Sequence, residues 1–230
     1  MKMLRTQRPQ GQLGGFPSMQ VPFGSQFLQT FGRIMDSLNV SSAIVFIDLA
    51  NAFHCLIREL VSGIVVPNDV EAVLERLLHE GLPVRDIIEL LQLPSLLERL
   101  GAPPFITQLI QDFHTGTWMY VPGAYQPIVT RKGTRPGSPL ADCIFHILTA
   151  DIATELNDVV ASNQDLQDIL SKADLHAESV IWADDVAIPV ATVNAVDLPG
   201  ATAGTLQAVH KIFATRGFVL NFKKGKTSVD

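Results

Sequence analysis

The most constraining feature of the sequence is an apolar run, Ala43–Ile47, that ends directly on an acid, Asp48. The run is β-branched and aromatic, which is typical of a buried strand. Two further acids, Asp184 and Asp185, stand between two short apolar segments, at the predicted tip of a hairpin. Carboxylates beside buried strands are costly unless a partner or a cation compensates their charge. These three acids therefore limit both the fold and the chemistry of the chain.

The apolar spacing predicts an α+β fold, in which an antiparallel sheet packs on helices. Residues 1–25 are rich in Gly, Gln and Pro and are expected to be loop-like, residues 157–178 are polar with weak helical character, and Pro199-Gly200 is expected to form a turn. Helices are expected at about 27–38, 50–60, 69–78, 83–93, 95–100, 104–114, 139–156 and 203–215, and strands at 43–47, 118–121, 128–130, 180–182, 186–190 and 218–222.

Composition excludes several classes of protein. The chain is 47% hydrophobic and 17% charged, so disorder is not its main description. No apolar stretch reaches about 18 residues, so no membrane span is expected. The cysteines, Cys55 and Cys143, lie in apolar segments and indicate reduced thiols in an intracellular protein, of the nucleus or the cytoplasm.

Charge is unevenly distributed along the chain. The net charge of −6 argues against a generic basic nucleic-acid binder, yet residues 1–10 and 211–230 are both basic. A basic tail beside an acidic body fits a phosphate-facing strip next to a cation site, and it equally fits ordinary solvated surface charge.

Convergence of the three acids would require a cation or a proton. Two carboxylates about 4 Å apart near a surface repel by roughly 4 kcal/mol at an effective dielectric constant near 20. Hard divalent cations, Mg²⁺ first, suit an all-carboxylate cluster, and two such ions are the usual arrangement for in-line phosphoryl displacement. The alternative is an ordinary Asp-Asp turn and an unrelated acid at a strand end.

Four segments, in this order along the chain, resemble the motifs of a reverse transcriptase palm. They are Phe46–Phe53, Gly133–Leu140, Trp182–Asp185, and Gly217–Asn221 with Lys226-Thr227. The resemblance is to polymerases of retrotransposons that lack long terminal repeats. It covers about residues 12–230 and is weakest over 54–115. It implies a palm domain at 26–230 with partial fingers, no thumb and a helical insertion at about 61–115.

The resemblance implies roles for the acids. Asp48 and Asp184 would bind two Mg²⁺ ions, with Mn²⁺ as an alternative, Asp185 would support them, and the backbone carbonyl of Leu49 would be a further ligand. The metals would activate the primer 3′-hydroxyl and neutralise charge on the departing pyrophosphate.

The resemblance also assigns a lysine to the triphosphate. Lys226 would donate a proton to pyrophosphate or bind the triphosphate, and Lys223 and Lys224 are its close competitors. The alternative for all three is a basic turn that contacts solvent or backbone phosphate.

Phe53, Arg135, Pro136 and Gly137 are the implied nucleotide-binding residues. The ring of Phe53 would exclude a ribose 2′-hydroxyl by bulk, which favours deoxynucleotides; alternatively, Phe53 packs a helix against the sheet. Arg135 to Gly137 would line the floor beneath the incoming base. Pro136 stands where the family usually has Gln, and proline supplies neither a side-chain amide nor a backbone N–H.

The function expected from the resemblance is that of an RNA-directed DNA polymerase domain. Its partners would be an RNA or DNA template with a primer and deoxynucleoside triphosphates, and another chain could supply the polymerase segments that are missing. The alternative is a catalytically inactive palm relic that acts at most as a nucleic-acid or protein binding module. A two-metal nuclease is disfavoured, because it needs neither Phe53 nor the glycine loop before Ser138.

Overall fold

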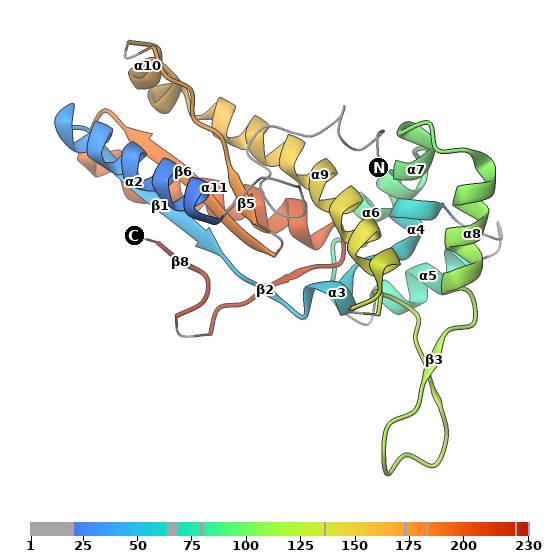
Figure 1. Cartoon of the computed structure of the whole chain (residues 1–230). Coiled ribbons are helices and arrows are strands. Elements are labelled where there is room, and N and C mark those ends of the chain that lie inside the picture. The colour runs from blue at the N-terminus through green and yellow to red at the C-terminus, as the bar shows by residue number, and fades with distance from the viewer. Residues whose placement is uncertain are drawn as a thin grey trace. The chain divides into compact units, whose positions relative to one another are not determined.

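The fold is α+β with antiparallel sheets, as the sequence predicts. The computed structural model describes residues 21–63, 69–78, 81–135, 137–172, 174–182, 184–223 and 225–229. Its internal contacts divide the chain into two compact units, and the helix α9, Pro139–Ser162, passes from one to the other (Figure 1). Unit 1 comprises 1–50, 149–213 and 219–230, and unit 2 comprises 51–148 and 214–218.

Unit 1 contains a four-stranded antiparallel sheet in the order β5-β6-β1-β8. The strands are β1 Ser41–Ile47, β5 Val180–Trp182, β6 Asp185–Thr192 and β8 Ser228–Val229. The central pair, β1 and β6, is in continuous register from Ser41 opposite Thr192 to Ile47 opposite Val186. A separate two-stranded sheet joins β2, Leu49–Ala50, to β7, Val219–Leu220.

Helices cover this sheet. They are α2 Val21–Ser37, α10 Gln164–Lys172, the 3-10 helix η1 Ala195–Asp197 and α11 Leu198–Ala214. α2 contacts β1, β5 and β6, and α10 contacts β6. Alternate residues of β1, Ala43, Val45 and Ile47, are buried, while nearly all of β6 is buried. The apolar run of the sequence therefore forms the centre of the unit 1 core.

Two expected loops of unit 1 are helical. α2 begins at Val21, so the expectation of a loop is wrong for residues 21–25, and residues 1–20 lie outside the described part. α11 begins at Leu198, so the expected turn at Pro199-Gly200 is wrong. In both helices a proline stands in the first turn, where its missing N–H would have no intrahelical acceptor.

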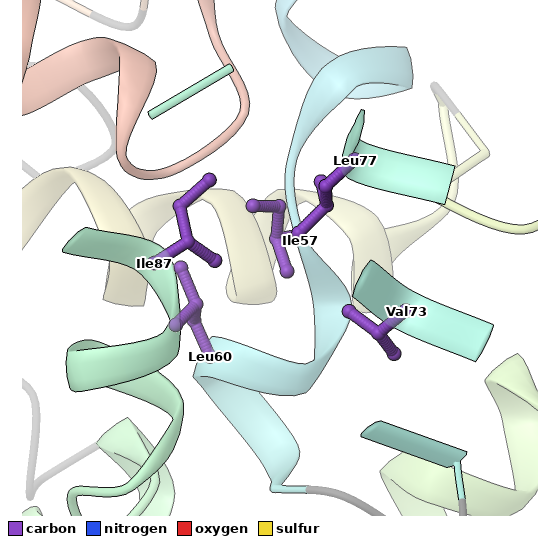
Figure 2. Packing of buried hydrophobic residues seen from close by; sticks show 5 residues of the cluster. All are labelled: Ile57, Leu60, Val73, Leu77 and Ile87. Atoms are coloured by element: carbon purple, nitrogen blue, oxygen red, sulfur yellow. The ribbon is translucent and has the colours of Figure 1, made fainter. Parts of the chain in front are cut away.

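Unit 2 is built mainly from short helices around an apolar cluster. The cluster comprises Ile57, Leu60, Val73, Leu77 and Ile87 (Figure 2). Its elements are α3 Ala52–Cys55, α4 Arg58–Ser62, α5 Asp69–Leu78, α6 Val84–Leu91, α7 Leu96–Arg99, α8 Pro104–His114 and the hairpin strands β3 Trp118–Met119 and β4 Ile128–Val129. No described helix is long and apolar enough to cross a membrane. Cys55 and Cys143 are both half-buried and form no disulfide.

The continuous helix expected over 50–60 is wrong. Ala50 lies in β2, and Asn51 has a left-handed backbone with φ 53°. Leu56 and Ile57 are extended and separate α3 from α4. The backbone N–H of Ile57 donates to the carbonyl of Arg216 at 3.0 Å, so a tertiary hydrogen bond replaces the one that a helix would supply.

Two glycines approach the α3–α4 turn closely. Gly133 has φ 73°, and a Cβ atom there would lie 2.5 Å from backbone atoms of His54. Gly217 has φ 89°, and a Cβ atom there would lie 2.5 Å from the carbonyl oxygen of Cys55. The N–H of Gly133 donates to the carbonyl of Leu56 at 2.8 Å. The second and fourth motif segments therefore meet the turn through backbone contacts that only glycine permits.

We expect Gly133→Ala to destabilise the protein much more than Gly101→Ala. Gly101 is a matched control, because it has φ 68° but open space around its Cβ position. The control should cost about 1–2 kcal/mol for the left-handed backbone alone. The clash at His54 should add about 2 kcal/mol or more. Urea denaturation of both variants measures the difference, and equal losses would contradict the close contact.

Candidate carboxylate site

The pairing of β1 with β6 brings the three predicted acids to one end of the sheet. Asp48 directly follows Ile47, Asp185 directly precedes Val186, and Ile47 and Val186 are opposite one another. Asp48 and Asp185 are therefore neighbours across the two strands. Asp184 lies in the turn of the β5–β6 hairpin, next to Asp185.

The electrostatics of Asp185 reflect this convergence. Desolvation is the largest cause that raises the pKa of the Asp185 carboxyl above its ordinary value of 3.8, although the residue as a whole is exposed. The negative charges of Asp184 and Asp48 raise this pKa further, and the Lys226 ammonium opposes the shift. The like charges thus act on one another strongly enough to disfavour ionisation of Asp185.

Asp48 is compensated by two side chains from the fourth motif segment. The Asn221 side-chain amide donates to Asp48 Oδ2 at 2.6 Å, and the Lys226 ammonium contacts Oδ1 at 3.3 Å. The carboxylate side chain is 20% exposed and the lysine 49%, so this ion pair contributes up to about 1 kcal/mol. Of the three competing lysines, Lys226 is the one placed at Asp48; Lys224 lies outside the described residues.

Backbone contacts fix the same segment around Asp48. The N–H of Asn221 donates to the Asp48 carbonyl at 2.8 Å, and the N–H of Asp48 donates to Thr227 Oγ1 at 3.3 Å. The N–H of Thr227 in turn donates to the carbonyl of Asn221 at 3.0 Å. Leu49, the next residue, is buried in β2 opposite Leu220. The first and fourth motif segments therefore form one hydrogen-bonded structure.

A hollow of about 400 Å³ lies beside the carboxylates in unit 1. Leu28 of α2, Phe46 of β1 and Trp182 of β5 contribute much of its apolar lining. Asp48, Asp185 and Lys226 also line it, so the acids border a space that can admit a small group.

The carboxylate oxygens of the site are suitable ligands for a hard cation, but in this structure the Lys226 ammonium occupies the position beside Asp48 Oδ1. Carboxylate oxygens are the ligands that Mg²⁺ prefers, and their mutual repulsion is what a cation would relieve. Among the described residues, however, no three Asp, Glu, His or Cys side chains stand together as a metal-binding group. At Asp48, the Lys226 ammonium takes the place of an external cation.

The predicted nucleotide-binding residues form a second group, in unit 2. Phe53 stacks on Phe145 with ring centroids 4.5 Å apart, and its carbonyl accepts the N–H of Thr134 at 2.6 Å. Arg135 and Gly137 are exposed. Pro136 lies outside the described residues. The structure thus brings Phe53 to the loop of the second motif through packing and backbone contact.

Two structurally important polar residues were given no role by the sequence, although Asn221 ends the fourth motif segment. Asn221 follows the apolar segment 218–220, so the rule that singled out Asp48 at a strand end could have found it. Arg58 is the first residue of α4 and is buried, donating to backbone carbonyls of Gly133, Lys132 and His114. Because Glu59 follows it directly, the sequence around Arg58 carries no clear signal that this arginine is buried.

Comparison with known protein families and with curated proteins gives no match to the chain. Inference about function therefore starts from the motifs and from the geometry of the two groups of residues described above.

We expect Asp185→Asn to stabilise the protein at neutral pH. The raised pKa means that the folded protein binds the Asp185 proton more tightly than the unfolded chain does. The protonated carboxyl therefore makes its full contribution to the free energy of unfolding below pH 3.8, and this contribution is lost as the pH rises through the folded-state pKa. Removing the carboxyl should therefore raise the free energy of unfolding at pH 7 and leave it little changed below pH 3.8.

Asp158→Asn is the matched control, since Asp158 is an exposed acid of α9. Urea denaturation at both pH values measures the effect. If Asp158→Asn raised the free energy of unfolding at pH 7 as much as Asp185→Asn does, the stabilisation would result from the change in net charge and not from the local cluster of acids.

Proposed function

We propose that the chain is the palm-centred part of an RNA-directed DNA polymerase, which adds deoxynucleotides to the 3′-end of a primer. The observation that carries this proposal is the position of Asp48 beside the Asp184-Asp185 hairpin tip, on paired central strands. Acids on two separate motif segments meet at one sheet end, as the reverse transcriptase resemblance requires. The two segments are 136 residues apart in sequence, so strand pairing and not chain continuity brings them together.

Asp48, Asp184, Asp185 and the carbonyl of Leu49 would hold the divalent metals in this proposal. Mg²⁺ is the first candidate and Mn²⁺ the alternative, because both accept oxygen ligands. When bound, such a pair of ions activates the primer hydroxyl and neutralises charge on the leaving pyrophosphate. The carboxylates would supply the negative charge that retains the ions, and the hollow that Asp48 and Asp185 line would give space for them.

Lys226 would change partners in the working site. Its ammonium now contacts Asp48 Oδ1, the oxygen that a metal would need. Displacement by a divalent cation would release the lysine, which could then bind the triphosphate or protonate pyrophosphate. Asn221 would keep Asp48 oriented through the other carboxylate oxygen.

Phe53 and the loop around Arg135 and Gly137 would serve the incoming nucleotide. The stacking of Phe53 on Phe145 restricts the ring to one orientation, which a steric barrier to a 2′-hydroxyl requires. Template, primer and deoxynucleoside triphosphates would be the partners, and Pro136 would contribute through the shape of the loop alone.

A second candidate function is a palm relic that binds nucleic acid or protein without catalysis. Two observations favour it: Asp48 is already compensated by Lys226 and Asn221, and the sequence has Pro136 in place of the usual amide side chain. Both candidates predict the same fold, so activity has to separate them.

We expect Mg²⁺-dependent extension of a primer annealed to an RNA template, and its loss by a factor of about 10³ or more in Asp184→Asn. A labelled primer resolved on a denaturing gel measures the reaction. Asp158→Asn, which removes an exposed acid of α9, should retain full activity. Extension that survives Asp184→Asn, or its absence from the unaltered chain at all Mg²⁺ and Mn²⁺ concentrations, would favour the relic.

We expect Phe53→Ala to weaken discrimination against ribonucleotides by about tenfold or more, because the smaller side chain leaves room for the 2′-hydroxyl. The ratio of kcat/KM for a deoxynucleotide to that for the matching ribonucleotide measures this. Loss of the stack on Phe145 should also cost about 0.5–1.5 kcal/mol of stability. Phe145→Leu removes the same stack and is the control; an equal change in sugar choice would assign the effect to packing.

A further inference from the structure

The hairpin of unit 2 carries an unusual group of exposed rings. Trp118 is 63% and Tyr120 64% exposed, and Tyr125 is fully exposed. The chain contains only two tryptophans and two tyrosines, so this one hairpin holds both tyrosines and half of the tryptophans. Figure 1 shows the hairpin, labelled at β3, projecting away from the helices of unit 2. These rings are therefore presented to solvent at the one place where the chain concentrates them.

Both faces of the hairpin are open. Trp118 is opposite Val129 on one face of the ribbon, and Met119 is opposite Ile128 on the other. All four are exposed. A two-stranded ribbon with no covered face gains little stability from its own apolar contacts, so burial in a core does not explain these side chains.

The charged residues of the hairpin segment are all basic. From Phe113 to Ala141 the sequence contains no Asp or Glu, although the whole chain has 23 acids and a net charge of −6. The same stretch contains Arg131, Lys132 and Arg135, of which both arginines are exposed. The segment itself therefore offers a polyanion positive charge and contributes no carboxylate of its own.

The base of the hairpin is rigidly anchored. The buried Arg58 guanidinium donates to Thr117 Oγ1 at 3.0 Å and to Thr130 Oγ1 at 3.1 Å, one from each strand. The N–H of Thr130 donates to the Thr117 carbonyl at 2.8 Å. Because its base is fixed and its rings are exposed, the hairpin is preorganised for binding, so little conformational freedom would be lost when a ligand binds.

We propose that this hairpin binds single-stranded nucleic acid, by stacking unpaired bases on Trp118, Tyr120 and Tyr125 while the neighbouring cations contact the phosphate backbone. Stacking tolerates any base, because every base has a π-face, and it requires that the bases be unpaired. Exposed rings on a segment whose own charged residues are all basic match this ligand better than a protein surface, which carries both acidic and basic side chains. The site belongs to unit 2, and the proposal does not depend on polymerase activity.

Fluorescence anisotropy with a labelled single-stranded oligothymidylate of about 12 nucleotides tests the site. We expect Trp118→Ala/Tyr125→Ala to weaken binding by about tenfold or more, since each stacked ring contributes roughly 1–3 kcal/mol. The matched control is Phe105→Ala/Phe113→Ala, which removes two exposed rings from α8 of the same unit. It should change the affinity by less than about twofold.

A spectroscopic readout reports on the ring itself. In Trp182→Phe, Trp118 is the remaining tryptophan, and its fluorescence should be quenched as the oligonucleotide is added. The same sequence annealed into a duplex should bind more weakly, and affinity should fall as salt is raised.

The proposal would be overturned by an intact chain that does not bind the oligonucleotide, by equal losses in the hairpin and α8 variants, or by tighter binding of the duplex. Because the altered rings are exposed, the variants should keep the thermal stability of the unaltered chain, which excludes unfolding as the cause of a loss. A negative result in this binding experiment would not contradict the proposed polymerase function. That function is tested by primer extension with the Asp184→Asn variant, whereas this site is tested by binding without nucleotides.

Discussion

The register between β1 and β6 is the constraint on which the rest of unit 1 depends. The two strands pair from Ser41 opposite Thr192 to Ile47 opposite Val186, and β1 buries alternate residues while β6 is buried along nearly its whole length. A shift by one residue would move the buried side chains of β1 to its other face, so the burial of β1 fixes the register. Asp48 and Asp185 come next to each other as a direct consequence, and their separation is set by backbone pairing and not by side-chain choice.

Once the acids converge, their charge has to be compensated. Asp185 shows the cost, since the charges of its two neighbours add to desolvation in raising its pKa. The charge of Asp48 is compensated, because Asn221 donates a hydrogen bond to one carboxylate oxygen and the Lys226 ammonium contacts the other. The same segment holds the Asp48 backbone, so it supplies the compensation from a fixed position. A mobile external cation could replace the ammonium without altering these backbone contacts.

Sequence reasoning succeeded where a single local signal determines the structure. The apolar run before Asp48 and the two arms around Asp184 predicted their strands, because a buried strand needs only apolar residues of sufficient length. The helix at 104–114 was predicted with its observed bounds, from proline at its start and apolar spacing along it.

Sequence reasoning failed where distant segments decide the structure. The helix expected over 50–60 is interrupted because the Ile57 amide is bonded to Arg216 and because Gly133 and Gly217 approach the chain at His54 and Cys55. β8 was not expected, since two paired residues carry no periodicity that could be recognised. The contact of Lys226 with Asp48 likewise follows from tertiary structure, although the resemblance had named both residues.

The distribution of charge links the two proposed roles of the chain physically. A site that holds acids together repels a polyanion, and a protein of net charge −6 has little general attraction for nucleic acid. The segment from Phe113 to Ala141 contains three Lys or Arg residues and no acid, so in the proposed role it would attract phosphate despite the negative net charge of the chain. Exposed charges act over only about 10 Å in ordinary salt, so local charge matters more to such a contact than net charge. In the proposed role the exposed aromatic rings would supply a short-range attraction by stacking, which does not depend on net charge, so their concentration on one hairpin is the observation on which that proposal depends.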